Sequence, residues 1–225
     1  MSNLLKTKHG LFTTQSENNT IYQNLKEYGE FNEANFQVLC NFIEKDDILI
    51  DVGSDFGYLS VFLSRKLEDT GKIIAFDCQK HKFHETCANT AINSLGNIYP
   101  SKLMIGEKSE SCTFKNQNVI KITLDSLNLP KFKLLALNFD KNQENCLMGA
   151  KSTLNRHKPL VFTQGKKSKI MNELGFQHIK VKSSSFNKDN YYGSEQKINN
   201  FRFFTNNLYI HPDSSAWSQW NILNI

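Results

Sequence analysis

The sequence lacks the features that would place the chain in a membrane, a disulfide framework or a zinc site. No run approaches the roughly eighteen continuous apolar residues of a membrane span, and the first ten residues contain no apolar signal core. The five cysteines are scattered singly without a CxxC pair, and their odd number argues against a disulfide framework. We therefore expect no membrane span and no bound metal, and we expect a cytoplasmic chain with reduced thiols.

Internal repeats and low-complexity tracts are also missing, and 225 residues are enough for one domain with its own core. We expect an N-terminal leader or lid over residues 1–32, a main domain over 33–212 and a tail over 213–225. In the tail, Trp217 and Trp220 stand at helical spacing. Docking on the domain surface is the simpler interpretation of this pair, and contact with a partner is the alternative.

Acidic residues are scarce in the C-terminal third of the chain. Residues 151–204 contain eleven basic and three acidic side chains, a local charge of +8 in a chain whose formal net charge is +5. A solvated lysine-rich surface is the simpler interpretation, and a face for an anionic substrate or partner is the alternative. The only dense basic run, residues 165–169, is short and lacks interleaved aromatics, so we expect no nucleic-acid partner.

Short apolar runs alternate with segments of helical periodicity along most of the chain. Continuous apolar runs that end at an acid or a turn are typical of buried parallel strands. Such runs lie at residues 48–52, 72–76, 132–139 and 160–163, with a shorter one at 103–105. The segments with helical spacing are 33–44, 58–67, 80–95, 144–156 and 168–174.

This alternation predicts a Rossmann-like α/β domain, in which a mostly parallel sheet carries helices on both faces. Residues 113–123 alternate weakly between apolar and polar side chains and predict a hairpin or an edge excursion. Two last strands, around 178–181 and 201–210, have no helix between them. They predict an antiparallel hairpin at the C-terminal edge of the sheet.

A glycine loop follows the first strand and leads into a helix, with the sequence Asp51-Val52-Gly53-Ser54-Asp55-Phe56-Gly57. Glycine permits the turn and a close approach of backbone to ligand, and the helix N-terminus favours negative ligand groups. An acid, Asp77, ends the next strand, where a carboxylate accepts both hydroxyls of a ribose. We therefore predict a nucleoside-bearing ligand in contact with Asp51, Gly53, Ser54, Gly57 and Asp77.

The glycine loop discriminates between two kinds of nucleoside ligand. A dinucleotide site needs G-x-G-x-x-G, whose second glycine makes room for pyrophosphate. Here only Gly53 and Gly57 are present, and the side chains of Ser54 and Asp55 would crowd a pyrophosphate, which Asp55 would also repel. S-adenosylmethionine has no phosphate and carries an ammonium group, which suits a loop flanked by acids. The loop therefore favours S-adenosylmethionine and disfavours a nicotinamide-dependent oxidoreductase.

With these residues in place, the chain resembles the FkbM-type methyltransferases from about His9 to Pro212, as a divergent member. The matching segments are His9–Phe12, Tyr28–Glu30, Asp51–Gly57, Ile74–Asp77, Cys87–Asn89 with Asn93, Ile105–Glu107, Thr123–Leu127, Gly149-Ala150 and Pro159. The resemblance implies a class I methyltransferase sheet and S-adenosylmethionine-dependent O-methylation of sugars, glycans or other secondary metabolites. It also implies that Gly106 and Glu107, in the loop after the third strand, contact the cofactor.

One motif departs from the family. Its fourth strand typically ends Lys-Ile-Asp-Val-Glu-Gly, whereas this chain has Asn138-Phe139-Asp140-Lys141-Asn142 in a segment about two residues shorter. The family's aspartate is retained as Asp140, and its lysine and glutamate are not. A methyltransferase-like domain that has lost turnover and serves as a binding or scaffold protein is therefore the alternative function.

Two acids are the candidate catalytic residues for a small-molecule or glycan acceptor. Asp140, at a strand end facing the expected cleft, is the candidate base, and a helix cap or a cofactor contact is its alternative role. Glu30 is a candidate for closing the site from the leader, and an acid at a helix start is its alternative. Tyr191-Tyr192 in a polar loop are packing residues in the simpler interpretation and part of a sugar site in the other. The oligomeric state stays open.

Overall fold

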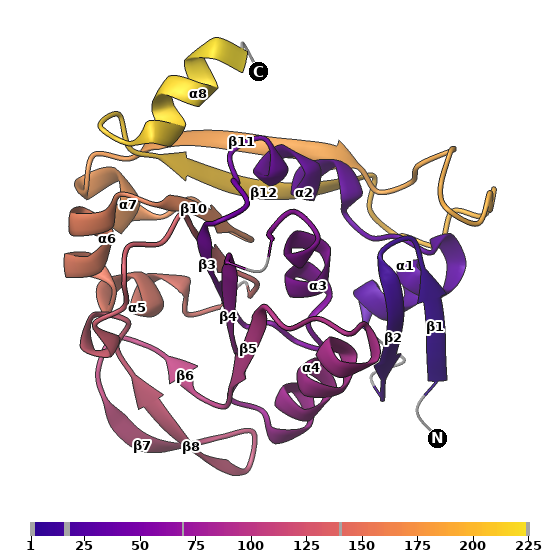
Figure 1. Cartoon of the computed structure of the whole chain (residues 1–225), viewed down its shortest axis with the longest axis horizontal. Coiled ribbons are helices and arrows are strands. Elements are labelled where there is room, and N and C mark those ends of the chain that lie inside the picture. Colours follow the sequence, from indigo (N-terminus) through magenta and orange to yellow (C-terminus); the bar gives the residue numbers. More distant parts are fainter. Residues whose placement is uncertain (1–2, 16–18, 69, 140, 224–225) are drawn as a thin grey trace.

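A seven-stranded sheet forms the centre of the computed structural model, which describes residues 3–15, 19–68, 70–139 and 141–223 (Figure 1). The strand order is β11-β12-β10-β9-β3-β4-β5, and all neighbours from β10 to β5 are parallel. The strands are β3 (Ile48–Val52), β4 (Lys72–Phe76), β5 (Ile98–Ser101), β9 (Leu134–Leu137), β10 (Leu160–Thr163), β11 (Gln177–Ser184) and β12 (Phe203–Ile210).

The predicted C-terminal hairpin is confirmed, since β11 and β12 pair antiparallel over their whole length. The last strand of the chain does not form the edge, however. Strand β12 lies between β10 and β11 and is antiparallel to both, so β11 forms the outer edge. The mostly parallel sheet with an antiparallel hairpin at one end is therefore the predicted one, and the structure adds the order of the two hairpin strands.

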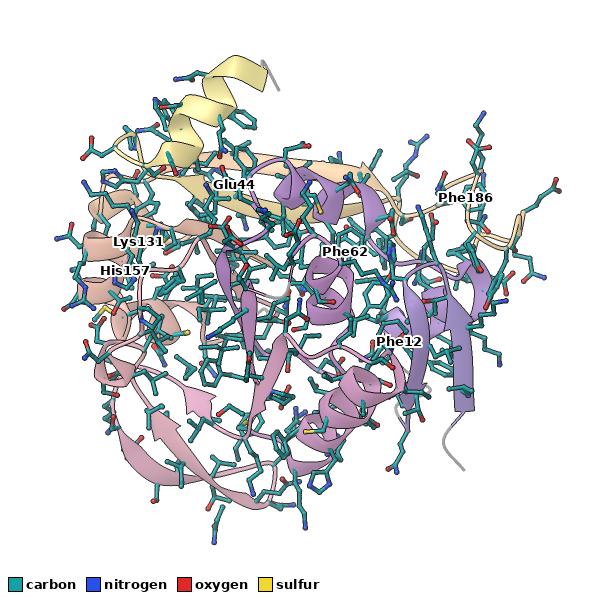
Figure 2. All side chains as sticks on the ribbon, viewed as in Figure 1. Phe12, Glu44, Phe62, Lys131, His157 and Phe186 are labelled. Atoms are coloured by element: carbon teal, nitrogen blue, oxygen red, sulfur yellow. The ribbon has the colours of Figure 1, made fainter. Side chains whose placement is uncertain are left out.

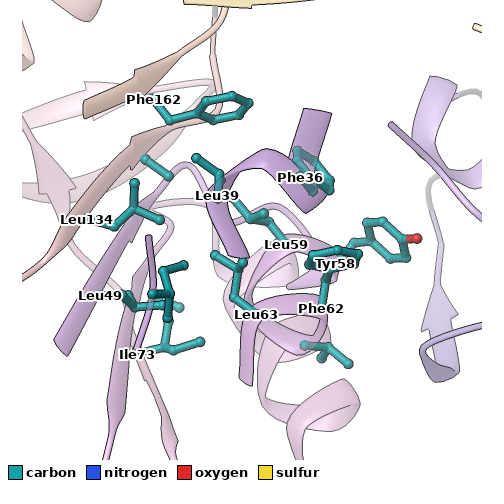
Figure 3. Close-up of a cluster of buried hydrophobic side chains, with 14 of the residues drawn as sticks. Phe36, Leu39, Leu49, Tyr58, Leu59, Phe62, Leu63, Ile73, Leu134 and Phe162 are labelled. Atoms are coloured by element: carbon teal, nitrogen blue, oxygen red, sulfur yellow. The ribbon is translucent and has the colours of Figure 1, made fainter. Parts of the chain in front are cut away.

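Helices cover both faces of the sheet, as predicted. Because successive residues of a strand point to opposite faces, Leu49 and Ile50 belong to two separate buried clusters. Figure 3 shows the first cluster, where Phe36, Leu39 and Phe62 lie over the sheet. Its helices are α2 (Glu33–Cys40) and α3 (Tyr58–Ser64), with α4 (Lys80–Ile92) beside α3; the opposite face carries α5 (Gln143–Met148), α6 (Lys151–His157) and α7 (Lys169–Glu173).

The prediction that residues 103–105 form the third strand of this sheet is wrong. The third strand is β5, whose Pro100 obscured it in the sequence. Proline removes a ladder donor and is tolerated only at an edge, and β5 is the edge strand here. Met104 and Ile105 form β6 in a separate sheet with the confirmed hairpin of β7 (Glu110–Phe114) and β8 (Gln117–Ile122), followed by a 3-10 turn, η1 (Asp125–Leu127).

The single helix predicted over residues 144–156 is two helices, α5 and α6, separated at Gly149-Ala150. The cause is a close approach of two backbone segments. A Cβ atom on Gly149 would lie 1.9 Å from the carbonyl oxygen of Gly106. Only glycine fits this contact, which joins the small sheet to the helical layer.

The N-terminal segment is an ordered part of the fold, with β1 (Asn3–Thr7), β2 (Gly10–Thr14) and α1 (Thr20–Tyr28). Side-chain amides of α4 bond the open edge of β2. Asn93 accepts from the Leu11 amide at 2.9 Å and donates to its carbonyl at 2.6 Å, and Asn89 does the same with Thr13 at 2.7 and 3.0 Å. Four helical residues span about 6.0 Å and two strand residues about 6.8 Å, so the two repeats stay in register.

The C-terminal helix α8 (Ser215–Leu223) docks on the domain, which confirms the simpler interpretation of the tryptophan pair. Trp217 and Trp220 pack against the first buried cluster, and the Trp220 ring stacks on Phe42 with a centroid distance of 6.4 Å. In the described part of the chain, no helix has both the length and the apolar character needed to cross a membrane.

We expect Asn89→Ala to lower the free energy of unfolding by about 3 kcal/mol. Asn89 is fully buried and also donates to the carbonyl of Phe56 at 2.8 Å, so its loss leaves buried backbone groups without partners. Urea denaturation measures the change, and Asn200→Ala, at an exposed site, is the matched control. Equal stability of the two variants would show that the amide ladder does not hold the N-terminal hairpin.

Candidate functional site

A cavity of about 400 Å³ opens at the carboxyl edge of the sheet, above the glycine loop. This volume lies within the range of roughly 300–1,000 Å³ typical of small-molecule sites. We call it the loop cavity. The sheet side of its wall is formed by Gly53, Ser54, Asp55, Phe56, Tyr58, Leu59, Asn138 and Gln164. The opposite side comes from the N-terminal segment (Asn19, Thr20, Ile21 and Phe31), from Phe36 on α2, from Phe201 just before β12 and from Phe204 on β12.

The glycine loop has the backbone shape that its sequence predicts. Gly53 and Gly57 have φ angles of 74° and 85°, in the left-handed region that favours glycine. A Cβ atom on Gly53 would lie 2.7 Å from the ring of Phe139, so a side chain there would displace the ring. The hydroxyl of Ser54 is buried without a hydrogen-bond partner among the described residues. Gly53 and Ser54 thus reach the cavity wall, and Ser54 has a free polar group.

Asp55 takes the place of the middle glycine and also adopts a positive φ of 54°. Its carboxylate forms an ion pair of 2.5 Å with the buried Lys82 and accepts from the Asn19 amide at 2.5 Å. Because Lys82 compensates its charge, Asp55 does not supply the repulsion of pyrophosphate that we expected. The case against a dinucleotide therefore rests on the volume of this side chain.

Asp51 lies beneath the glycine loop, outside the cavity lining. It is buried, and it accepts hydrogen bonds of 2.6 Å from the Ser60 hydroxyl on α3 and 2.6 Å from the Asn138 amide after β9. Burial raises the pKa of Asp51 to about 6, and the nearby Asp77 and Asp55 raise it further against these two hydrogen bonds. Asp51 therefore holds three elements together and places a titratable charge below the loop.

Asp77 ends β4 beside the loop, where the sequence placed it. One carboxylate oxygen accepts from the backbone N–H of Gln79 at 2.9 Å, and the other accepts from the backbone N–H of Asp55 at 3.2 Å. Burial raises the pKa of Asp77 above its usual value, and Asp55 raises it further. A carboxylate has about four acceptor sites, so these two hydrogen bonds occupy about half of them. Asp77 does not line the loop cavity itself.

The remaining predicted cofactor residues lie elsewhere. Gly57 packs under the loop, where a Cβ atom would be 3.0 Å from the Thr86 side chain. Gly106 is buried between Gly149 and Lys121, and the neighbouring Glu107 is exposed. The structure does not bring Gly57, Gly106 or Glu107 to the wall of the loop cavity.

The two candidate catalytic acids differ in what the structure shows. Asp140 lies outside the described residues, two positions after the cavity residue Asn138. Glu30 is buried next to the cavity residue Phe31, yet its carboxylate faces away from the lining. It accepts from the Asn187 amide at 2.7 Å and lies 3.7 Å from the Lys8 ammonium. These contacts tie the N-terminal segment to the chain between β11 and β12.

Sequence reasoning missed the second wall of the cavity. Asn19 gave a signal, because an asparagine before a helix is a typical N-cap, and its side chain does accept from the Ile21 amide at 2.7 Å. Phe31 and Phe201 gave none, since their role depends on which segments meet in space. Tyr191 and Tyr192 line neither of the two cavities described in this article, so no cavity supports their alternative role in a sugar site. Among the described residues, no group of three or more His, Cys, Asp or Glu is placed to hold a metal ion.

We expect Asp51→Asn to remove a pH dependence of stability. The pKa of Asp51 is about 6 in the folded chain against an ordinary value of 3.8, so between these pH values the folded chain holds a proton that the unfolded chain has lost. This contribution to the free energy of unfolding is therefore present below pH 4 and is lost as the pH rises through 6. An asparagine keeps both hydrogen bonds, because its oxygen accepts from Asn138 and its nitrogen donates to Ser60.

At pH 7 the variant should thus be more stable than the natural chain, by on the order of 3 kcal/mol. Urea unfolding from pH 4 to 7 measures this, with Asp189→Asn, at an exposed carboxylate, as control. Parallel stability profiles of Asp51→Asn and the natural chain would contradict the assignment.

Comparison with known proteins finds similarity in structure alone. No model of a known protein family matches the chain, and no curated protein sequence does. The fold is similar to the methyltransferase FkbM from Methylobacillus flagellatus KT, with 12% identity and a TM-score of 0.53 over 74% of this chain and 44% of that one. It is also similar to a SAM dependent methyltransferase from Aquifex aeolicus, with 13% identity and a TM-score of 0.50 over 83% and 92% of the two chains.

A third similar structure is Trm5b from Pyrococcus abyssi, with 11% identity and a TM-score of 0.50 over 93% of this chain and 55% of that one. The chain therefore spans less than half of the FkbM structure and just over half of Trm5b. At these identities the likeness defines the fold. The chain has a Rossmann-like class I methyltransferase fold, as the sequence predicted.

Proposed function

We propose that the chain is an S-adenosylmethionine-dependent O-methyltransferase of the FkbM kind, acting on a hydroxyl of a sugar, a glycan or another secondary metabolite. The observation that supports S-adenosylmethionine as the cofactor is the chemistry of the side chains that line the loop cavity. Its described lining contains no lysine or arginine, one carboxylate and six aromatic rings. Aromatic faces attract cations, whereas a phosphate ligand needs donors of positive charge; the one carboxylate, Asp55, is already paired with Lys82. A sulfonium with an ammonium group fits this wall better than a pyrophosphate does.

The residues of the loop would bind the cofactor by its separate groups. Gly53 and Ser54 offer a close backbone approach and a free hydroxyl to its amino-acid end. Asp77 lies beside the loop, outside the described lining, and is our candidate to accept from the ribose hydroxyls, and Asp51 supplies negative charge beneath the loop. We retain Gly57 as a residue that shapes the loop. Gly106 and Glu107 stay in the proposal only through the family resemblance.

Methyl transfer needs mainly that acceptor and methyl group be held in line. The bound cofactor supplies a methyl group on a positively charged sulfur. On transfer, the acceptor oxygen would bond to this methyl carbon, and the electron pair of the broken carbon–sulfur bond would stay on sulfur. The proton of the acceptor hydroxyl goes to a base, for which Asp140 is our candidate. The aromatic side chains of the wall opposite the loop, Phe31, Phe36, Phe201 and Phe204, would exclude water from this reaction. The five free cysteines fit a reducing, cytoplasmic setting.

A binding protein without turnover is the second candidate function. The observation that favours it is the position of Asn138, which stands where the family has its lysine. The Asn138 amide donates to Asp51 and so has a structural partner below the loop. A methyltransferase-like scaffold would bind the cofactor in the loop cavity and release no methylated product.

We expect S-adenosylhomocysteine to bind the chain in isothermal titration and NAD not to bind. We further expect Asp77→Ala to weaken the binding of S-adenosylhomocysteine by roughly tenfold or more, because charge-assisted bonds to the ribose are lost. Asp189→Ala removes an exposed carboxylate and is the control that should leave affinity unchanged. Tight NAD binding without binding of S-adenosylhomocysteine would refute the cofactor assignment, and equal affinities in the two variants would remove Asp77 from the site.

Turnover distinguishes the two candidate acids. With a labelled methyl donor and a glycan extract, Asp140→Asn should lose methyl transfer while its affinity for S-adenosylhomocysteine is kept. In Glu30→Gln the side-chain oxygen still accepts from Asn187, so this variant should keep turnover if Glu30 only ties the N-terminal segment to the chain between β11 and β12. Loss of turnover in Glu30→Gln alone would move the base to Glu30, and no transfer by the natural chain would favour the scaffold.

A further inference from the structure

Between β11 and β12 the chain leaves the sheet over residues 185–202 and folds back onto the N-terminal segment. Figure 2 shows Phe186 on this excursion, at the end of the molecule that also carries α1 and the β1–β2 hairpin. The Tyr28 hydroxyl donates to the Gln196 carbonyl at 2.8 Å. Asn24 and Asn199 exchange hydrogen bonds of 3.0 and 2.9 Å. The excursion is therefore fastened to α1 by specific bonds and has a defined shape.

A second cavity, of about 170 Å³, lies between the excursion and α1. The rings of Tyr28, Phe186 and Phe201 form its apolar wall, and Lys197 and Arg202 are its charged residues. Phe201 also lines the loop cavity, so the two cavities share one wall. A molecule in the second cavity would therefore have one end next to the proposed methyl donor.

The positive charge of the second cavity has no acidic counterpart. Its described lining contains no aspartate or glutamate, and the described residues form no ion pair with Lys197 or Arg202. The Lys197 ammonium lies 5.5 Å from the ring centre of Phe186, and the Arg202 guanidinium lies 5.9 Å from that of Phe203. Charge-assisted hydrogen bonds from such groups to a carboxylate or phosphate are among the strong ones.

We propose that the second cavity is the acceptor subsite and that it selects a ring bearing an anionic group, a carboxylate or a phosphate. The ring packs on Tyr28, Phe186 and Phe201, and the anion meets Lys197 and Arg202. A hydroxyl on the far side of the ring then reaches past Phe201 into the loop cavity. This inference rests on the proposed function, and it narrows the acceptor to acidic or phosphorylated rings such as uronic acids and sugar phosphates.

The shape of the site favours a single ring over a nucleic-acid strand. Single-stranded nucleic acids are held by a groove that follows many phosphates, with aromatic platforms for successive bases. Here two cations flank one small cavity, whose walls are tied together by the bonds to α1. A wall ordered before binding lowers the entropy that a ligand loses when it is fixed there.

The test uses the full chain with S-adenosylhomocysteine present and three probes: glucuronate, glucose 6-phosphate and glucose. We expect ligand-observed NMR titration to show at least one anionic probe binding tenfold or more tightly than glucose. Binding of glucuronate alone identifies a carboxylate, binding of glucose 6-phosphate alone identifies a phosphate, and binding of both identifies a general anion site. The binding should weaken as salt is added, because the attraction is electrostatic.

A double variant, Lys197→Gln with Arg202→Gln, should lose tenfold or more of the affinity for the anionic probe. Its affinity for S-adenosylhomocysteine should be unchanged, because neither residue lines the loop cavity; this also shows that the variant is folded. Lys188→Gln is the matched control, since Lys188 is an exposed lysine of the same excursion that lies outside the cavity lining.

Three results would overturn the subsite. They are equal binding of glucose and the anionic probes, no binding of either anionic probe, and equal losses in the double variant and in Lys188→Gln. A single-stranded oligoribonucleotide that binds more tightly than the probes and is lost in the double variant would replace the subsite with a nucleic-acid surface. Absence of S-adenosylhomocysteine binding, with the probe results as expected, would remove the proposed function and leave the anion site.

Discussion

The buried carboxylate of Asp51 is the interaction on which the candidate site depends. It joins the end of β3 to Ser60 on α3 and to Asn138 after β9, so the glycine loop above it is fixed on two sides. A buried charge next to two other acids lowers stability when it is ionised, and burial raises the pKa of Asp51 to about 6. Ionisable groups with such shifted pKa values cluster at functional sites. A cationic ligand over the loop would offset the cost of ionising this group.

The candidate site also depends on the N-terminal segment, which forms part of the cavity wall opposite the sheet. Asn19 reaches the loop through Asp55, and Asp55 in turn pairs with Lys82 on α4. The same helix bonds the edge of β2 through Asn89 and Asn93. The loop, α4 and the N-terminal segment therefore form one connected polar network. A segment that resembles a leader in the sequence is thereby a wall of the site.

The positions of strands and helices could be predicted from the sequence where a single physical rule decides them. Runs such as 48–52 and 160–163 are apolar throughout because both faces of the sheet are covered, and both were placed at the correct residues. Pro100 hid β5, because whether a proline fits a strand depends on its place at an edge. Gly149 divided a predicted helix, because its contact with Gly106 is set by tertiary structure. The acids of the site were found from strand ends, whereas Phe201 and Lys197 come from an excursion without periodicity.

The two cavities differ in charge, and this difference determines which of the two proposed ligands each cavity favours. The loop cavity has carboxylates beside or beneath it and no lysine or arginine in its described wall, whereas the second cavity has two cations and no acid in its own. A positively charged donor is therefore disfavoured in the second cavity, and an anionic acceptor is disfavoured in the first. Phe201 lines both cavities, so attraction between the two bound molecules would act across this side chain. The basic composition of residues 151–204, which a solvated surface explains for most of its lysines, thus includes Lys197 and Arg202 at the place where an anion would be oriented for transfer.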